Sequence, residues 1–173
     1  MTRCFIGLGA NLGDSHQALI QAAQGLERLA DNRRLERSAV YRSAPIGPQD
    51  QPDYLNAVIA MDTILEPLAL LNSLQSLEEN AGRVRDLHWG PRTLDLDLLI
   101  YGDVTLDSPR LTLPHPRLFE RNFVLRPLAD IVGEAWTFVD GSTLGQRISD
   151  CPANELQRTG LGWSVTQPKA MSA

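Results

Sequence analysis

The sequence predicts an α+β fold, in which helices pack on an antiparallel sheet and a small C-terminal appendage follows. Two observations predict it. Apolar stretches of strand length alternate with stretches whose apolar residues recur at helical spacing, in the order strand, helix, strand and then strand, helix, strand again. Loops rich in proline, glycine and charge separate these elements. This order is the ferredoxin-like pattern of two split βαβ units.

The first strand–helix–strand unit occupies the start of the chain. Residues 3–8 form an apolar run that ends at Gly9, which predicts a buried strand. Asp14 or Ser15 can cap the helix that follows. Apolar residues at helical spacing predict this helix, and they are Leu19, Ile20, Ala23, Leu26 and Leu29. Residues 34–41 alternate in polarity, which is compatible with a second strand or with an irregular segment.

The second unit begins after a proline-rich loop at residues 43–53. Residues 54–64 predict a third strand. Pro67 suits the first position of the next helix, and Gly82 suits its end. The apolar stripe of that helix is formed by Leu70, Leu71, Leu74 and Leu77. A loop at 83–92 then leads to a fourth strand at 93–101.

The chain after the fourth strand predicts only short elements. They are a Pro-His-Pro turn at 114–116, a helix near 125–132 and a strand at 136–139. The last residues have the composition of a frayed terminus. We therefore predict one domain at 1–160 and a flexible tail at 161–173.

A glycine-rich stretch, GLGANLG at residues 7–13, follows the first predicted strand. A dinucleotide-binding fingerprint would require glycine at position 12, where this sequence has leucine. We therefore interpret the stretch as a tight turn between a strand and a helix.

The composition argues against several classes of protein. The net charge of −5 disfavours nucleic-acid binding, and no apolar run of about 18 residues predicts a membrane span. Cys4 and Cys151 have no metal-binding or redox spacing, so a reduced, cytoplasmic protein is predicted. The chain has fifteen arginines and one lysine, Lys169, which excludes the lysine of a P-loop or a protein kinase. Any phosphate chemistry must therefore depend on arginine and metal ions.

Two aspartates in the fourth predicted strand, Asp95 and Asp97, are the first candidate site residues. Because strand side chains alternate between faces, both carboxylates share one face, about 7 Å apart. The other face is taken by Leu94, Leu96 and Leu98. Paired carboxylates in an apolar strand repel unless a cation lies between them, and such oxygen ligands select Mg²⁺. A solvated face of an edge strand is the alternative interpretation.

Basic residues on both sides of this strand favour the functional interpretation. The arginines are Arg83, Arg85, Arg92, Arg110, Arg117, Arg121 and Arg126, and His115 lies between two prolines. A metal ion with an arginine clamp is the usual equipment for binding polyphosphate. Some of these arginines would be solvated or paired with nearby acids, and we expect Arg117 and Arg126 to be among them.

Three aromatic residues lie in or beside the loops around the acidic pair: Tyr54, Trp89 and Phe123. Flat rings that converge on a site can stack on a flat heterocycle. Ordinary core packing is the alternative.

Four segments, in order along the chain, resemble the 6-hydroxymethyl-7,8-dihydropterin pyrophosphokinase family. They are GLGANLGD at 7–14, YRSAPIGPQDQPDYLN at 41–56, WGPRTLDLD at 89–97, and LPHPR at 113–117 with RNFVLRPL at 121–128. The resemblance implies a monomer with a ferredoxin-like core that acts in folate biosynthesis. Its reaction would transfer diphosphate from ATP to the pterin alcohol, giving AMP and the pterin diphosphate.

The resemblance also implies roles for individual residues on the phosphate side. Two Mg²⁺ ions would be held by Asp95 and Asp97. ATP contacts would come from Gln75, Glu78, Arg85, Arg110, Thr112, His115 and Arg121. A mobile loop would carry Arg83, Trp89 and Arg92, and its two arginines would act on the transferring diphosphate.

On the other substrate, the resemblance implies that the pterin stacks between Tyr54 and Phe123. Polar contacts to the pterin would come from Asn56 and from the backbone around Ser43, Ala44 and Ile46.

Two other functions are compatible with part of the sequence. A nucleotidyltransferase also uses an acidic strand, but it would attack the α-phosphorus of ATP and release pyrophosphate. The Gly-Ser turn that this class places before its acidic strand is not found in the sequence. A ferredoxin-like regulator that binds ATP without turnover is the non-enzymatic alternative, and the paired aspartates argue against it.

Overall fold

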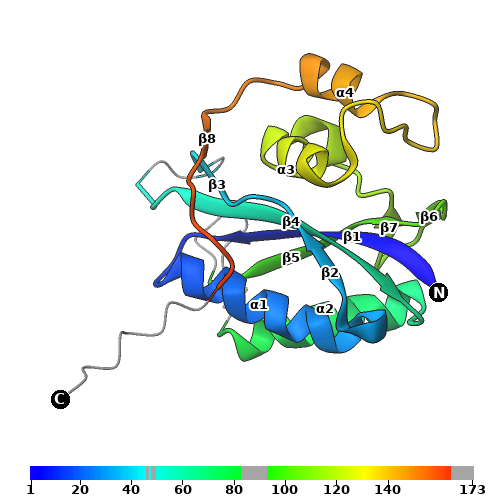
Figure 1. The fold of residues 1–173 in the computed structure, drawn as a ribbon, viewed down its shortest axis with the longest axis horizontal. Helices are drawn as coiled ribbons and strands as arrows, with labels where there is room; N and C mark the ends of the chain where they lie inside the picture. Colours follow the sequence, from blue (N-terminus) through cyan, green and yellow to red (C-terminus); the bar gives the residue numbers. More distant parts are fainter. Residues whose placement is uncertain (46, 48–49, 83–92, 165–173) are drawn as a thin grey trace.

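A computed structural model describes residues 1–45, 47, 50–82 and 93–164 of the chain. Within these residues the strands form a six-stranded antiparallel sheet in the order β5-β1-β4-β3-β8, with β2 also paired to β4 (Figure 1). The bounds are β1 Thr2–Ala10, β2 Leu35–Arg37, β3 Tyr41–Ser43, β4 Tyr54–Thr63, β5 Asp95–Tyr101 and β8 Leu156–Arg158. The first strands of the two βαβ units, β1 and β4, are neighbours at the centre of the sheet, and the last strands, β5 and β3, flank them, which confirms the predicted α+β fold with a ferredoxin-like core.

The second predicted strand is divided into two short ones, because a side chain takes over the pairing between them. The Ser38 hydroxyl accepts a hydrogen bond of 2.8 Å from the backbone nitrogen of Val58, and the Ser38 nitrogen donates to the Val58 carbonyl at 2.9 Å. Both β2 and β3 pair with β4 on either side of this point. The ambiguity of residues 34–41 in the sequence therefore reflects a real interruption.

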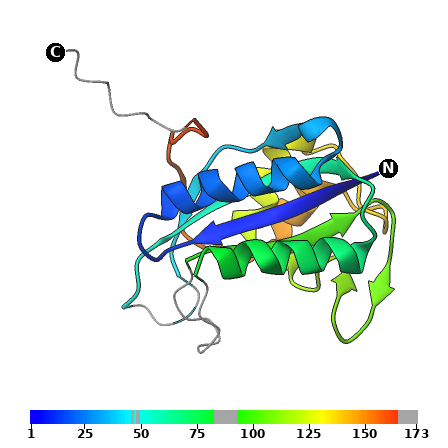
Figure 2. The ribbon, with the colours of Figure 1, turned by 90° about the horizontal axis from the view of Figure 1, so that it is seen from below.

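One face of the sheet is covered by helices α1 (Ser15–Leu29) and α2 (Pro67–Asn80), which lie side by side across it (Figure 2). Asp14 caps α1 as predicted, since its side chain accepts from the backbone nitrogen of Gln17 at 3.0 Å. The two helices approach closely at Gly25, where a Cβ atom would lie 2.6 Å from a methyl carbon of Leu77. The core on this face includes Ile6, Leu19, Leu26, Leu70, Leu74, Leu96 and Leu98.

The opposite face is covered by α3 (Asn122–Val132), and α4 (Leu144–Asp150) packs against α3 (Figure 1). Here Phe5, Trp136 and Phe138 pack edge to face, with ring centroids 4.9–5.8 Å apart. The predicted strand at 136–139 is wrong, because only an isolated bridge between Thr137 and Thr143 forms. The remaining short elements are η1 (Asp31–Arg33), β6 (Leu106–Asp107), β7 (Thr112–Leu113) and η2 (Leu118–Glu120).

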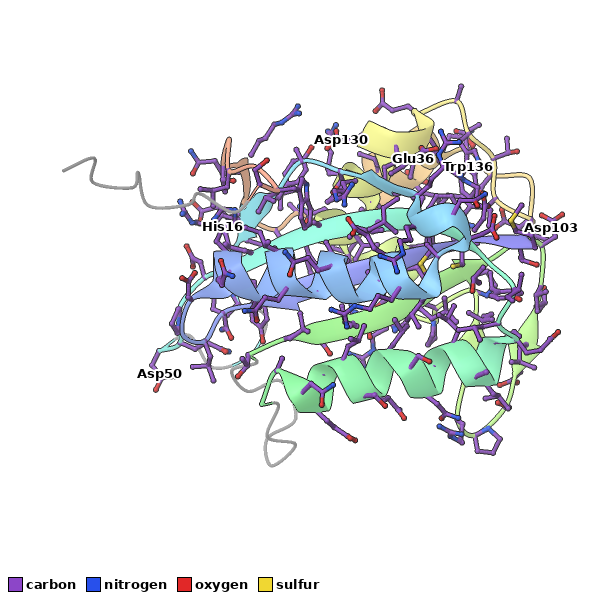
Figure 3. The ribbon with its side chains drawn as sticks, turned by 60° about the horizontal axis from the view of Figure 1, so that its bottom comes forward. His16, Glu36, Asp50, Asp103, Asp130 and Trp136 are labelled. Carbon is purple, nitrogen blue, oxygen red and sulfur yellow. The ribbon has the colours of Figure 1, made fainter. Side chains whose placement is uncertain are left out.

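The end of the described chain returns to the sheet. Strand β8 pairs with β3, and the indole nitrogen of Trp163 donates to the Ser38 carbonyl at 2.8 Å. His16, at the start of α1, lies close to this segment (Figure 3), and its Nε2 atom is 2.7 Å from the Gly162 carbonyl. Residues 165–173 lie outside the described residues, so the flexible tail stays a prediction. No helix in the described part of the chain is long and apolar enough to cross a lipid bilayer.

Candidate active site

A pocket opens on the sheet face that carries α3, beside the first turn of that helix. The space between its lining residues is about 660 Å³, part of which is open solvent. Eight of the residues predicted for the site line it: Ser43, Ala44, Tyr54, Asn56, Asp95, Asp97, Arg121 and Phe123. The acidic pair and the aromatic pair of the predicted site therefore line the same pocket.

The two aspartates lie on strand β5 and face the glycines of strand β1. The register pairs Asp95 with Gly9 and Asp97 with Gly7. Side chains of directly opposite residues are neighbours on the same face of a sheet, so the glycines leave the space beside each carboxylate open. The spacing of two in the glycine stretch thus matches the spacing of two in the aspartate pair.

Our interpretation of residues 7–13 as a turn was wrong for its first part, because β1 continues through Ala10. Gly7 and Gly9 are part of the strand, and both line the pocket. A Cβ atom at Gly9 would lie 3.5 Å from Oδ1 of Asn56 and 3.6 Å from Cδ1 of Tyr54. Glycine at this position therefore keeps open the space between two predicted pterin contacts.

Asp97 lies beside two basic residues from the chain after β5. A terminal nitrogen of Arg121 is 3.3 Å from Oδ2 of Asp97, and Nε2 of His115 is 3.9 Å from Oδ1. The Arg121 side chain is only 15% exposed, so its charge is screened less by water than that of a surface arginine. A cation, a carboxylate and an imidazole thus meet at one edge of the pocket.

His115 is held in its neutral form. Burial, followed by the nearby charges of Arg121 and Arg117, lowers the pKa of His115 from 6.5 to about 4. The backbone nitrogen of Arg117 donates to Nδ1 at 3.2 Å, which places the single ring proton on Nε2, the atom nearer Asp97. His115 therefore offers a hydrogen-bond donor, and no charge, at neutral pH.

The wall of predicted pterin contacts is built from β3, β4 and the start of α3. Asn56 is 3% exposed and donates from Nδ2 to the Ser43 hydroxyl at 2.6 Å. Phe123 is partly buried, and the Arg121 guanidinium carbon lies 5.8 Å from its ring centroid. Arg121 thus lies between the ring of Phe123 and the carboxylate of Asp97.

The residues predicted to contact ATP divide into two groups. Arg121 lines the pocket, whereas Gln75, Glu78, Arg110, Thr112 and His115 are not among its lining residues. Arg110 donates to Oδ1 of Asn72 at 2.5 Å and to Oε1 of Gln75 at 3.5 Å. Its guanidinium therefore lies against the surface of α2. Glu78 is 2% exposed, and its carboxylate accepts from the backbone nitrogen of Leu96 at 3.0 Å. Gln75 and Glu78 thus belong to α2 and Arg110 contacts that helix, whereas His115 lies beside Asp97.

Five of the predicted residues are not described by the structure, and six lining residues were not predicted. Ile46, Arg83, Arg85, Trp89 and Arg92 lie outside the described residues, and their roles stay predictions. Other residues line the pocket although sequence reasoning missed them: Gly7, Leu8, Gly9, Gly47, Ala57 and Val124. The period-two match between glycines and aspartates is the signal that could have found Gly7 and Gly9.

The residues present fit a magnesium site. Asp95 and Asp97 supply hard oxygen ligands at the edge of a pocket, and the Asp97 side chain is 32% exposed. Among the described residues, no group of three or more His, Cys, Asp or Glu side chains could hold a metal ion. A pair of carboxylates with room for phosphate oxygens and water is the arrangement typical of Mg²⁺ and not of a closed structural site.

Comparison with known proteins agrees with this geometry. Residues 5–133 match the family model of 7,8-dihydro-6-hydroxymethylpterin-pyrophosphokinase. A protein of Pseudomonas aeruginosa, named 2-amino-4-hydroxy-6-hydroxymethyldihydropteridine pyrophosphokinase, is 45% identical over 156 residues, 90% of this chain and 96% of the relative. A relative of the same name from Haemophilus influenzae is 44% identical over 134 residues, 78% of this chain and 84% of the relative.

Solved structures agree in fold. The Plasmodium falciparum HPPK-DHPS crystal structure with pteroate matches with a TM-score of 0.67 at 13% identity, over 86% of this chain. The chain covers 42% of that longer protein. At this identity the match establishes the shared fold alone.

Proposed function

Because this chain belongs to the 7,8-dihydro-6-hydroxymethylpterin-pyrophosphokinase family and is a pyrophosphokinase of folate biosynthesis, we propose which of its residues carry out the reaction. The reaction transfers diphosphate from ATP to 6-hydroxymethyl-7,8-dihydropterin and gives AMP and the pterin diphosphate. One observation carries the proposal: a single pocket has two aromatic residues and a buried amide on its walls and the paired carboxylates at its edge. The nucleotidyltransferase and the ATP-sensing regulator are set aside by family membership.

The pterin is proposed to bind between Tyr54 and Phe123. Its flat ring system matches two aromatic side chains that both line the pocket. The Nδ2 atom of Asn56 is used by Ser43, and its Oδ1 atom is directed toward Gly9 on the pocket floor. An acceptor in that position suits an N–H or amino group of the pterin, and the backbone of Ala44 offers further polar contacts.

Asp95 and Asp97 are proposed to hold two Mg²⁺ ions together with the phosphates of ATP. Such ions, when bound, neutralise the charge of the phosphate oxygens and bring the hydroxymethyl oxygen of the pterin toward the β-phosphorus. The protein's own part is to fix both carboxylates on one strand face and to align the two substrates. Alignment of this kind contributes about 7–11 kcal/mol in well-oriented reactions.

Arg121 and His115 are proposed to contact the diphosphate that is transferred. Arg121 lies between the aromatic wall and Asp97, which is the path the diphosphate takes from ATP to the pterin. Its guanidinium can pair two phosphate oxygens. The Nε2 proton of His115, on the same side of Asp97, is a neutral donor for a third oxygen.

The rest of ATP is proposed to lie on the α2 side of β5. Arg110 and Gln75, which are in contact there, support this placement, together with Glu78 and Thr112 on neighbouring elements. Arg83, Arg85, Trp89 and Arg92 complete the proposed ATP contacts from outside the described residues. We further propose that the protein acts as a monomer in the cytoplasm, on small molecules alone, in keeping with its net charge of −5.

Phosphorus NMR of the protein with ATP, Mg²⁺ and the pterin alcohol tests the reaction. We expect AMP and pterin diphosphate to form in equal amounts, and the Asp97→Asn variant to serve as the inactive control. ADP or free pyrophosphate as the main phosphorus product would contradict the proposal. Calorimetric titration of the pterin in the presence of a non-hydrolysable ATP analogue tests the binding assignment, since Tyr54→Ala and Phe123→Ala should weaken pterin binding much more than ATP binding.

A further inference from the structure

The pocket has two walls that come from distant parts of the chain. One wall is formed by Ser43 and Ala44 at the end of β3 with Tyr54 and Asn56 on β4, and the other is the first turn of α3 with Arg121 and Phe123. A ligand that stacks between Tyr54 and Phe123 contacts both walls at once. The distance between the walls therefore determines how well the pterin fits.

The first turn of α3 has no side-chain cap of its own. Arg121 occupies the capping position without a side-chain hydrogen bond to the helix. Instead, Asn122 donates from Nδ2 to the backbone carbonyl of Asn154 at 2.8 Å. This bond reaches 32 residues along the chain, and it is made by the residue between Arg121 and Phe123. The carbonyl can only accept, so the orientation of the Asn122 amide is determined.

The same stretch of chain also holds the opposite wall. The backbone nitrogen of Ala44 donates to the Glu155 carbonyl at 3.3 Å, and Nδ2 of Asn154 is 3.5 Å from the Ala44 carbonyl. The next residue, Leu156, pairs with Ser43 as the first residue of β8. Asn154 therefore contacts both the first turn of α3 and Ala44, and Glu155 contacts Ala44 alone of these two sides.

This stretch is fixed to the rest of the molecule farther along the chain. The Thr159 nitrogen and hydroxyl both donate to the Val40 carbonyl, at 3.0 and 2.9 Å. Trp163 donates to the Ser38 carbonyl at 2.8 Å and packs against the core beneath α1. The other end of α3 has a separate attachment, since Tyr41 donates to the Asp130 carboxylate at 2.9 Å. The first turn of α3, by contrast, is joined to the β3 side through Asn154.

We propose that Asn122 is a positioning residue for the pterin, because its bond to Asn154 ties the Phe123 wall to the segment that holds the Ala44 wall. The inference rests on the proposed function in one respect, namely that this pocket binds the pterin. Asn122 itself is not a pocket-lining residue. It acts by keeping Phe123 and Arg121 at the correct distance from Tyr54 and Ala44.

The effect should fall mainly on the pterin. Asn122→Ala removes the donor and leaves the Asn154 carbonyl without it, so the first turn of α3 is less restrained. We expect pterin affinity to fall by about three- to tenfold, which corresponds to the loss of one hydrogen bond. ATP affinity should fall by a clearly smaller factor, since Arg121 is the one proposed ATP contact on this turn, whereas Arg110 and Gln75 lie at α2.

Calorimetric titrations with the full chain test this. The pterin is titrated in the presence of a non-hydrolysable ATP analogue, and the analogue is titrated alone. Arg126→Ala is the matched control, because Arg126 is an exposed residue of the same helix. Trp163→Phe is a second variant that removes the donor to Ser38 from the far end of the segment, while keeping an aromatic ring in the core. It should weaken pterin binding in the same direction by a smaller factor.

The outcomes separate this inference from the proposed function. If the wild-type chain does not bind the pterin, the proposed function fails and the inference fails with it. If the wild type binds and Asn122→Ala binds the pterin within twofold of it, at a temperature where melting curves show a folded variant, the inference alone is overturned. Equal loss of both ligands would also overturn it, as the sign of a general structural role. If Asn122→Ala does not fold, Trp163→Phe is used in its place. Weaker pterin binding in that variant then supports the inference, and an unchanged pterin affinity overturns it.

Discussion

Glu78 and Leu96 join helix α2 to the strand that carries the paired aspartates: the Glu78 carboxylate accepts a hydrogen bond of 3.0 Å from the backbone nitrogen of Leu96. Leu96 lies between Asp95 and Asp97 in the sequence, so the bond restrains the backbone that carries both carboxylates. Glu78 is 2% exposed, and a buried carboxylate is costly unless it is hydrogen bonded. The alignment of both aspartates is thus linked to a side chain on the opposite face of the sheet.

Replacement of Glu78 should therefore affect both stability and catalysis. We expect Glu78→Ala to lower the free energy of unfolding by about 2–3 kcal/mol, because a buried backbone N–H loses a charged acceptor. Urea denaturation measures this, and steady-state assays should show a parallel fall in turnover. Glu78→Gln keeps an acceptor oxygen and should lose less of both. Glu79→Ala, at an exposed neighbouring position, is the control. Full turnover in Glu78→Ala would refute the link between this bond and the aspartates.

The paired aspartates should be essential for turnover and dispensable for folding. Asp95→Asn and Asp97→Asn keep the shape of each side chain but remove the charge that a magnesium ion requires. We expect each to reduce turnover by several powers of ten, with about 1.4 kcal/mol of activation free energy for every tenfold step. Circular dichroism should show an unchanged fold. Asp103→Asn, at an exposed position just after β5, should retain normal turnover. Near-normal turnover in Asp95→Asn or Asp97→Asn would contradict the proposal that these two carboxylates bind Mg²⁺.

A methyl group at Gly9 should interfere with the pterin and leave the protein folded. The Cβ atom would make ordinary contacts of 3.5 and 3.6 Å with Asn56 and Tyr54, so no backbone shift is required. It would occupy space on the pocket floor, and we expect Gly9→Ala to weaken pterin binding by about tenfold or more, or 1.4 kcal/mol. Calorimetry should show ATP binding within twofold of wild type. Gly162→Ala, where a Cβ atom meets nothing within 4 Å, is the control. Unchanged pterin affinity would mean that the ligand does not reach this floor.

The lowered pKa of His115 predicts a pH dependence of stability. Its folded-state pKa of about 4 is below the ordinary value of 6.5, so the unfolded chain binds more protons between these values. Stability should therefore decrease as the pH falls from about 6.5 to 4, by up to about 3 kcal/mol from this group. Urea denaturation of metal-free protein across this range measures the effect, and His115→Gln should flatten the slope. An NMR titration that gives His115 a pKa near 6.5 would contradict the prediction.

The sequence predicted the elements whose local signals agree with their tertiary setting. The helix capped by Asp14 and the helix that begins at Pro67 both start where the sequence indicated. Helix α3 begins at Asn122, three residues before the predicted 125, because its first turn is held by Asn154 and not by a capping side chain that a sequence would reveal. Strand β8 was not predicted, since a three-residue strand depends on its partner, β3.

The candidate site shows the same division. Asp95 and Asp97 could be found because a period of two on one strand is a local pattern. Gly7 and Gly9 were misinterpreted because their function is apparent only when β1 lies beside β5. The hydrogen bond between Glu78 and Leu96 could not be predicted either, since it depends on the packing of α2 against β5 and not on any spacing along the chain.

The pairing of β8 with β3 gives the protein an order of assembly during synthesis. Strands β1, β4 and β5 and helices α1 and α2 all precede residue 102, so the layer beneath the sheet can form before the C-terminal residues leave the ribosome. Asn154 and Glu155 are added long after Ala44 and Asn122. A nascent chain therefore carries its acidic strand before Asn154 and Glu155 are made, and the proposed pterin pocket is braced on both walls only after these two residues have left the ribosome.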